Sequence, residues 1–490
     1  MKLDKLIYEN ELTNEEDLSI WDIEIVTTKP NEITHSSLFV FLQSEFFNVE
    51  RIADYVMAKS PIVILADNEL KISSDRIKIL RCKSTRDLLP FIYSRFYNIN
   101  YDRLKFCAVT GTNGKTTTAT MIHHILRKRS INAGFIGTGK ILINEEKITD
   151  DNYSMTTPDP DILYRSIKRM EEAECKIIVM EVSSHALYYN KVAPIFFEIS
   201  IFTNLSPEHL DFHKNMDEYF KTKLKLFSKT KYGIFNLDDP YGRLAYESMS
   251  ENRISFSANT SADAMAEEIK EISLMKTEFK YLSAGKKTDV ILKLGGRYNV
   301  YNAALAICAT ALLGIDEIFA SKAISGIEYI DGRLEIISNK ITVIIDYAHT
   351  HTALENVLKT IISYKNTEQR LLTVFGCGGN RDRYKRPKMA AVAEKHSDSV
   401  IVTADNSRNE PLENIIADIL KGFKSTNKRI VITSRAAAIE HAILSAKDGD
   451  LIAIIGKGHE RYNIDENGYS TFDEREIVKK AIAKRNGEKL

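Results

Sequence analysis

The chain has 490 residues, 44% of them hydrophobic, which fits a globular protein of about three domains. Lys+Arg and Asp+Glu number 67 each, so the overall charge gives no reason to expect a nucleic-acid partner or an anionic membrane surface. The five cysteines are scattered without a CxxC pair, a distribution that favours reduced thiols and argues against a zinc site.

Residues 1–102 open with a charged stretch, MKLDKLIYENELTNEED, that does not resemble a signal peptide. No segment of the sequence approaches the roughly 18 consecutive apolar residues that a membrane-spanning helix requires. Short apolar runs such as SSLFVFL and SPIVILAD alternate with helix-like pieces but carry no clear chemical motif. We therefore expect a cytoplasmic protein without membrane insertion.

From RLKFCAVTG onward, apolar runs of strand length alternate with helical periodicity, which indicates an α/β fold with parallel sheets. The pattern predicts strands at 105–110, 176–182 and 197–204 and a helix at 299–313. The more polar, alternating stretch 252–294 predicts a small antiparallel patch.

A glycine-containing segment at 324–337 is typical of a linker, and strands and helices alternate again after it. This pattern predicts a second α/β sheet of the kind that binds nucleotides. Its predicted strands are 341–346, 371–376, 398–403, 429–433 and 450–455.

The sequence AVTGTNGKTTT (108–118) follows a predicted strand and opens a predicted helix, the context that a phosphate-binding loop requires. Its backbone N–H groups can converge on phosphate oxygens at the start of that helix. Lys115 can reach the β- and γ-phosphates of a nucleotide, and the Thr116 hydroxyl can bind magnesium. Val109 stands where the usual motif has its first glycine, and the alternative interpretation is a plain glycine-rich turn.

Glu181 ends one predicted strand and His209 follows the next, and ligands gather at the carboxyl ends of parallel strands. Both side chains could bind a divalent ion beside the phosphate loop, although His209 could equally be a capping or surface histidine. Lys221, Lys223 and Lys225 have the spacing of one solvated helix face, which does not distinguish Lys223 from its neighbours.

The stretch TADNSRNEP (403–411) allows two interpretations. Asp, Asn and Ser are preferred where a helix begins, and Pro411 suits a first helical turn. The same loop follows a predicted parallel strand, so it could instead hold a substrate.

Nine motifs occur in an order that resembles the Mur ligase family, most closely its MurE type. The resemblance covers roughly residues 105–465, and its motifs are GTNGKTTT, EVSSHAL, NLSPEHLDFH, YNVYNAALA, DGRLE, DYAHT, FGCGGNRDRYKRPKM, DNSRNE and GKGHE.

The resemblance implies three domains: a small N-terminal UDP-substrate-binding α/β domain (1–102), a central P-loop-type ATP-binding domain (103–332) and a C-terminal Rossmann-like domain that binds the incoming amino acid (333–490). It also implies a ligase of peptidoglycan precursor synthesis that adds a diamino acid to UDP-N-acetylmuramoyl-L-alanyl-D-glutamate. ATP would phosphorylate the terminal carboxylate, and the incoming amine would attack the acyl phosphate and expel phosphate. A monomer acting on small-molecule substrates is expected.

The family motifs assign roles to individual positions. Catalytic roles fall to Lys115, Glu181, His209 and a carbamylated Lys223, and magnesium would be held by Thr116, Glu181, His209 and Lys223. ATP contacts fall to Gly111, Thr112, Asn113, Gly114, Lys115, Thr116, Thr117, Asn299, Asn302, Arg333, Asp346 and His349. The muramoyl peptide would contact Thr156, Thr157, Ser184 and Lys191. The incoming amino acid would contact Arg381, Asp405, Asn406, Arg408, Gly456 and Glu460.

The chain departs from the family pattern mainly toward the UDP-sugar side, where Thr27, Thr28 and Lys29 replace an Asp-Ser-Arg triplet. Lys191 stands for the usual arginine, and Ser407 for the usual proline. Arg408 favours meso-diaminopimelate over L-lysine, because a guanidinium can bind the distal carboxylate through two hydrogen bonds. The alternatives are lysine as the added amino acid, a ligase acting on a different carboxylate scaffold, and a non-catalytic nucleotide-binding subunit.

Overall fold

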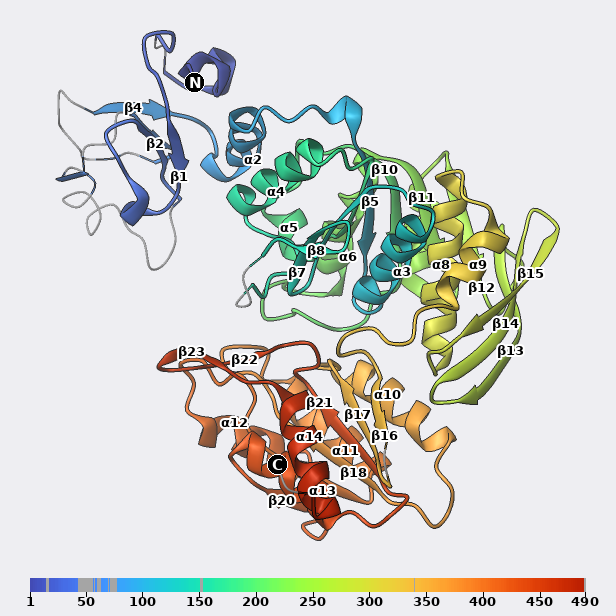
Figure 1. The fold of residues 1–490 in the computed structure, drawn as a ribbon. Coiled ribbons are helices and arrows are strands. Elements are labelled where there is room, and N and C mark those ends of the chain that lie inside the picture. The colour runs from blue at the N-terminus through green and yellow to red at the C-terminus, as the bar shows by residue number, and fades with distance from the viewer. Residues whose placement is uncertain are drawn as a thin grey trace.

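The computed structural model describes residues 1–14, 17–42, 56, 58–59, 63–68, 70, 77–149, 153–338 and 340–488. Sheets of four, eleven and six strands follow one another along the chain. Figure 1 shows them in three lobes, coloured blue, teal to yellow, and orange to red. This arrangement confirms the predicted multi-domain α/β architecture.

The N-terminal sheet is parallel, in the order β1-β2-β3-β4. Helix α2 (Thr85–Phe96) follows it, begins where the Ser84 side chain accepts a hydrogen bond from the Asp87 N–H, and packs on α4 (Pro160–Glu172) of the next lobe. The strands are β1 (Ile25–Thr27), β2 (Ser37–Val40), β3 (Val63–Ala66) and β4 (Lys78–Arg81).

The central sheet has the order β15-β14-β13-β12-β11-β10-β5-β9-β6-β7-β8 and is parallel from β13 to β6. The three strands predicted here are confirmed as β5, β9 and β10, and their side chains are almost continuously buried, as in sheets covered on both faces. The bounds from β5 to β11 are β5 (Lys105–Thr110), β6 (Ala133–Gly137), β7 (Lys140–Ile143), β8 (Glu146–Lys147), β9 (Ile177–Glu181), β10 (Phe197–Phe202) and β11 (Thr230–Asn236).

Two apolar clusters cover the faces of this sheet. Helices α3 (Lys115–Lys128), α8 (Arg297–Leu312) and α9 (Glu317–Ile324) bury one face, and α4 and α6 (Met216–Leu224) lie in the cluster on the other. Helix α8 is rich in alanine, and its close packing on α3 leaves most of its side chains without solvent contact. The remaining helices are α5 (Ser184–Tyr188) and α7 (Pro240–Ser248).

The antiparallel patch predicted at 252–294 is confirmed, except at its first strand. Strand β12 (Arg253–Ser257) pairs in parallel with β11, so the region continues the central sheet. Strands β13 (Ala264–Ser273), β14 (Lys276–Ser283) and β15 (Lys286–Leu292) do form an antiparallel extension, visible at the right of Figure 1. The alternating pattern fits an edge that is half solvated, because α8 and α9 cover only one of its faces.

The C-terminal sheet has the order β16-β17-β21-β18-β19-β20, and all its pairs except β16–β17 are parallel. Helices α10, α11 and α12 cover one face, and α13 and α14 the other. The strands are β16 (Glu335–Ser338), β17 (Thr342–Asp346), β18 (Leu371–Phe375), β19 (Ser399–Val402), β20 (Arg429–Val431) and β21 (Leu451–Ile455), and a separate hairpin consists of β22 (Tyr462–Asp465) and β23 (Gly468–Thr471). The helices are α10 (His351–Ser363), α11 (Lys385–His396), α12 (Leu412–Leu420), α13 (Arg435–Ser445) and α14 (Glu474–Asn486).

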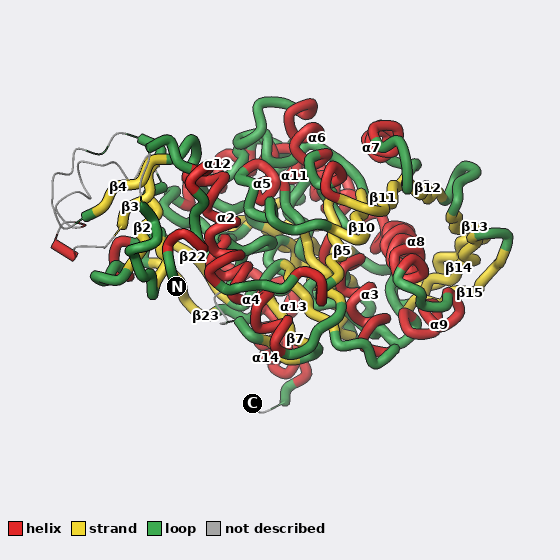
Figure 2. Tube along the Cα trace, turned by 90° about the horizontal axis from the view of Figure 1, so that it is seen from above, coloured by secondary structure: helices red, strands yellow, loops and turns green. Residues whose placement is uncertain are grey.

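The tube view of Figure 2, from above, shows the N-terminal strands at the left and α3 and α8 side by side right of centre. Among the described helices, none is both long and apolar enough to cross a membrane.

Candidate active site

The carboxyl ends of β5, β9 and β10 face the C-terminal lobe across a cleft of about 520 Å³. Residues from the phosphate loop and from the loops after β18, β19 and β21 line this cleft. The site therefore lies where both parallel sheets present their strand ends, the usual position for ligands in such folds.

The phosphate loop has the backbone conformation that its glycines permit. Gly111 has a φ of 141° and Gly114 a φ of 85°, and the helix α3 begins directly afterwards at Lys115. A Cβ atom on Gly111 would lie 2.0 Å from the Thr203 hydroxyl, and one on Gly114 would lie 2.4 Å from the Asn302 amide oxygen. The loop is thus closely packed against its neighbours and presents backbone N–H groups at a helix start.

Lys115 is held inside this loop. Its Nζ donates to the carbonyl oxygens of Gly111 at 3.0 Å and Thr112 at 2.9 Å. Burial lowers the pKa of Lys115, while the carboxylates of Glu208 and Glu181 oppose that shift.

Glu181 is fully buried at the end of β9 and is hydrogen-bonded on both oxygens. Its Oε2 accepts from the Thr116 hydroxyl at 2.9 Å, and its Oε1 accepts from the Thr138 N–H at 2.8 Å. The Thr138 hydroxyl adds a third contact at 3.1 Å. The Thr116 oxygen also accepts from Arg333 Nη2 at 3.1 Å, which joins the linker to the phosphate loop.

Lys223 is not on the solvated face that lysine spacing alone suggested. Its side chain is 1% exposed, and Nζ donates to the Gly111 carbonyl at 3.0 Å. Burial, helped by the nearby charge of Lys115, holds the pKa of Lys223 well below its ordinary value, which shifts the equilibrium toward the neutral amine. Lys221 on the same helix is exposed and pairs with Asp217 at 2.7 Å.

His209 and His349 both lie close to the carboxylate of Glu208, a residue that the motifs alone did not single out. Glu208 Oε1 lies 2.7 Å from His349 Nε2 and 3.8 Å from His209 Nε2. Burial would raise the pKa of Glu208, but the contact with His349 and the charge of Lys115 hold it well below its ordinary value. Burial also lowers the pKa of His209 to about 3, which favours the neutral imidazole that metal ions bind.

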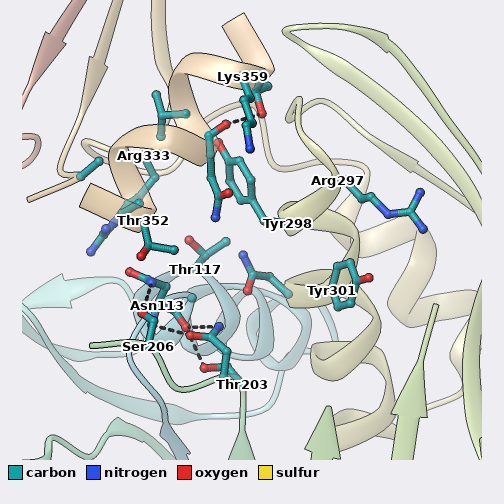
Figure 3. Close-up of a pocket in the computed structure, with 18 of the residues that line it drawn as sticks. Asn113, Thr117, Thr203, Ser206, Arg297, Tyr298, Tyr301, Arg333, Thr352 and Lys359 are labelled. Carbon is teal, nitrogen blue, oxygen red and sulfur yellow. Dashed lines mark hydrogen bonds between the residues drawn. The ribbon is translucent and has the colours of Figure 1, made fainter. Parts of the chain in front are cut away.

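A second cavity, of about 570 Å³, lies on the other side of the phosphate loop (Figure 3). Six residues predicted to contact ATP line it: Asn113, Gly114, Thr117, Asn302, Arg333 and Asp346. Motif reading had not singled out other side chains on its wall, including Thr203, Ser206, Arg297, Tyr298, Tyr301 and Lys359.

Asn299 is not among the residues that line this cavity. Its side chain donates to the Gly295 carbonyl at 2.8 Å and accepts from Asn302 Nδ2 at 3.2 Å. Asn299 therefore orients Asn302, which does face the cavity.

In the C-terminal lobe, four charged or amide side chains form one buried network. Asn406 donates to Glu460 Oε2 at 2.7 Å and accepts from Lys457 Nζ at 2.7 Å. Lys457 lies 3.6 Å from Asp405 and 3.7 Å from Glu460. A Cβ on Gly456, which has a φ of 122°, would stand 3.0 Å from Asp405 Oδ2.

The charges of this network are unbalanced, with two carboxylates for one lysine. Burial raises the pKa of Glu460 to about 7, and the neighbouring Asp405 adds to the shift. Burial also acts to raise the pKa of Asp405, but Lys457 and Arg435 keep it below its ordinary value. The negative charge therefore resides first on Asp405, and Glu460 gains its charge near neutral pH.

Arg408 combines an unusual backbone with well-defined contacts. Its φ is 54°, its N–H donates to the Ile464 carbonyl at 3.0 Å, and its Nη1 donates to the carbonyls of Gly379 and Asn406. Arg408 and Arg381 both line the cleft. The loop is thus tied to the β22 hairpin through the main chain.

The helix-cap interpretation of TADNSRNEP is wrong. Helix α12 begins at Leu412 with Pro411 as its N-cap, and no side chain caps it. Glu410 instead accepts hydrogen bonds from Arg386 and from the Asn380 N–H. The polar residues of this loop make tertiary contacts because the loop after β18 lies directly against it.

A groove of about 350 Å³ lies between the N-terminal and central lobes. Thr27, Thr28, Lys29 and Lys191 line it, and Lys191 Nζ contacts Asp159 at 2.6 Å. Lys191 also lines the main cleft, so the two cavities meet at this side chain. Thr156 and Thr157 line the main cleft, whereas Ser184 is buried in α5 and its neighbours Ser183 and His185 reach the cleft wall.

Two family models match the chain: the Mur ligase middle domain over residues 109–310 and the Mur ligase glutamate ligase domain over residues 332–458. The chain belongs to the Mur ligase family. Two relatives are named UDP-N-acetylmuramoyl-L-alanyl-D-glutamate–2,6-diaminopimelate ligase. The one from Clostridioides difficile is 35% identical and covers 99% of this chain and 100% of its own, and the one from Clostridium perfringens is 38% identical over 86% and 87%.

Solved structures of the family share the fold. A structure of a UDP-N-acetylmuramoyl-L-alanyl-D-glutamate–2,6-diaminopimelate ligase superposes with a TM-score of 0.68 at 26% identity and covers 99% of both chains. A folylpolyglutamate synthase from Mycobacterium tuberculosis superposes with a TM-score of 0.62 at 17% identity, covering 77% of this chain and 93% of its own. The Mur ligase fold is thus also found in a protein whose name indicates a different substrate.

Three residues that sequence reading missed connect the family motifs. Thr138 anchors Glu181, Glu208 bridges His209 and His349, and Lys457 holds Asn406. Glu208 and Lys457 stand inside motifs already recognised, NLSPEHLDFH and GKGHE, so their position beside assigned residues was an available signal. Thr138 lies outside them and offered none.

Proposed function

We propose that this chain is an ATP-dependent ligase that joins meso-2,6-diaminopimelate to UDP-N-acetylmuramoyl-L-alanyl-D-glutamate. The observation that carries the proposal is a single cleft. The phosphate loop and Glu181 line one end of it, and Asp405, Glu460 and Arg408 line the other. The names of the full-length relatives supply the substrate class. In this proposal the N-terminal, central and C-terminal lobes bind the UDP group, ATP and the amino acid, respectively.

The chemistry requires a leaving group on a carboxylate. ATP transfers its γ-phosphoryl group to the terminal carboxylate, the amine of the amino acid attacks the acyl phosphate, and phosphate and a proton leave as the amide forms. Lys115 and the N–H groups at the start of α3 stabilise the negative charge of the phosphoryl group during its transfer. Arg333 and His349, which reach the central lobe from the C-terminal side, hold the two lobes together around the reacting groups.

Magnesium fits the residues beside the loop. In the described part of the chain no group of three or more His, Cys, Asp or Glu could hold a metal ion, so the ion would also need phosphate oxygens. Thr116, Glu181 and the neutral His209 would hold it, and it would neutralise charge on the phosphates.

Lys223 is suited to carbamylation. The neutral form of its amine can form an N–C bond with carbon dioxide and lose a proton, which converts an uncharged amine into a carbamate anion. The carbamate would supply the oxygen ligand that the sparse carboxylates of this region lack.

The amino-acid end of the cleft matches both groups at the far end of diaminopimelate. The excess carboxylate of the Asp405–Lys457–Glu460 network suits an ammonium group, and Arg408 with Arg381 suits a carboxylate. L-lysine offers the ammonium but no distal carboxylate, so it would leave both guanidinium groups without a carboxylate partner from the substrate.

The test measures phosphate release with ATP, UDP-muramoyl dipeptide and either meso-diaminopimelate or L-lysine, with the product identified by mass spectrometry. The proposal requires turnover that depends on all three substrates and is much faster with diaminopimelate. Turnover with lysine alone would overturn the choice of amino acid, and ATP binding without any turnover would favour a non-catalytic nucleotide-binding subunit.

A second candidate is a ligase for a different carboxylate scaffold. It is favoured by the groove at Thr27, Thr28 and Lys29, where the family's usual triplet is absent. Binding of UDP-N-acetylmuramoyl dipeptide, measured by calorimetry, decides between the two: saturable binding supports the first candidate, and none supports the second.

A further inference from the structure

Two loops frame the amino-acid end of the cleft, one after β18 carrying Arg381 and one after β19 carrying Arg408. They lie against each other through the main chain: the Gly379 N–H donates to the Asn406 carbonyl at 2.9 Å. A Cβ on Gly379 would stand 1.9 Å from the Ser407 carbonyl, so the contact leaves no space for a side chain. The spacing of the two arginines thus depends on this backbone contact.

A buried ion pair holds the same two loops from behind. Arg386, at the start of α11, is fully buried and donates from Nη1 and Nη2 to the two carboxylate oxygens of Glu410 at 2.6 and 2.7 Å. Its Nη2 also donates to the Gly378 carbonyl at 3.2 Å, and Glu410 accepts from the Asn380 N–H at 2.8 Å. The pair therefore makes contacts with both loops at once.

We infer that Arg386 and Glu410 are positioning residues that set the separation of Arg381 and Arg408 and thereby the affinity for the diamino acid. The inference rests on the proposed function of the cleft. Neither Arg386 nor Glu410 is among the residues lining the main cleft, so they act through the two loops. A two-point Arg–carboxylate pair fixes orientation as well as distance, which a single hydrogen bond does not.

The same sheet contains a matched control pair. Arg370 donates from Nε and Nη2 to Asp450 at 3.0 and 2.6 Å, and Asp450 also accepts from the Arg370 N–H at 2.9 Å. This pair lies where β18 and β21 begin, at the edge opposite the cleft. It has the same two-point chemistry and contacts neither loop, although its carboxylate is the buried partner, whereas in the Arg386–Glu410 pair the arginine is the buried one.

The experiment compares Glu410→Gln with Asp450→Asn, using the phosphate-release assay on the full chain after melting curves have shown each variant folded at the assay temperature. We expect Glu410→Gln to raise KM for meso-diaminopimelate about tenfold, with KM for ATP unchanged and kcat reduced less than about twofold. Asp450→Asn should lower the melting temperature without moving any of these kinetic constants. Arg386→Lys, which keeps the charge but loses the two-point contact, serves as the second variant if Glu410→Gln unfolds.

Equal KM values for diaminopimelate in Glu410→Gln and Asp450→Asn would overturn the inference. So would a parallel loss of ATP affinity, because that outcome indicates a general structural role. A wild-type chain that makes no amide with any diamino acid would instead refute the proposed function, which keeps the two failures distinct.

Discussion

The two ends of the cleft solve the binding problem differently. The phosphate end is organised around one glycine-rich loop and the helix after it, and the side chains of Lys115 and Lys223 donate to the carbonyls of that loop. The amino-acid end relies on buried charged side chains from loops after three separate strands, and its geometry follows from their mutual contacts. A local motif thus supplies the framework of one end, whereas the framework of the other end exists only in the folded lobe.

If this contrast is correct, the largest single effect should come from Lys223, the side chain beside the phosphate end that the fold makes unusual. Lys223→Ala should lower kcat by about a thousandfold or more, since it removes a group proposed to carry the carbamate. Short carboxylates such as acetate should restore part of the activity. The measurement is phosphate release with all three substrates.

Lys221→Ala is the control, because Lys221 lies on the same helix but is exposed. Equal activity in the two variants would remove the case for a special role of Lys223.

The next effect concerns the amino-acid end. Arg408→Lys should raise KM for meso-diaminopimelate by roughly 10- to 100-fold, because a lysine cannot reproduce the planar two-point contact with a carboxylate. KM for ATP should stay constant, as Arg408 does not line the nucleotide cavity. A variant that discriminates diaminopimelate from lysine as well as the wild type does would assign the distal carboxylate to another residue.

The two ends should also differ in pH dependence. Glu460 has a raised pKa of about 7, so it is increasingly protonated as the pH falls through that value and the site loses negative charge for an ammonium group. KM for the diamino acid should therefore rise about tenfold from pH 8 to pH 6. Steady-state kinetics across this range provide the measurement.

KM for ATP should stay flat over the same range, and Glu460→Gln should abolish the dependence for the diamino acid. If the variant retains the wild-type pH profile, the titrating group lies elsewhere.

The smallest effect is expected at Thr138, which supports Glu181 by two hydrogen bonds. Thr138→Val removes the hydroxyl contact at 3.1 Å and keeps the backbone contact at 2.8 Å, so activity should fall only about fivefold. Thr138→Ser keeps the hydroxyl and should match the wild type. If Thr138→Val lost as much activity as Lys223→Ala, Glu181 would depend on the Thr138 hydroxyl much more than expected for a carboxylate that keeps its other hydrogen bonds.

Much of the fold could be read from sequence periodicity. The parallel strands around Glu181 were predicted because fully buried strands read as continuous apolar runs, and β9 and β10 confirm it. The alternating pattern at 252–294 predicts the antiparallel strands but not the parallel pairing of β12 with β11, because alternation shows that one face is solvated and not which strand lies alongside. For a related reason the loop after β19 allows two interpretations from the sequence, because a loop rich in Asp and Asn suits a helix cap equally well until a neighbouring loop is placed against it.

By itself the sequence determined the phosphate loop, the order of the family motifs and the alternation of strands and helices, since these depend on residues close together in the chain. Only the tertiary structure decided that Lys223 is buried while Lys221 is exposed, that Glu208 bridges two histidines, and that Arg386 holds Glu410. Burial and charge pairing depend on segments far apart in sequence, and they set the protonation states and positions on which the proposed chemistry rests.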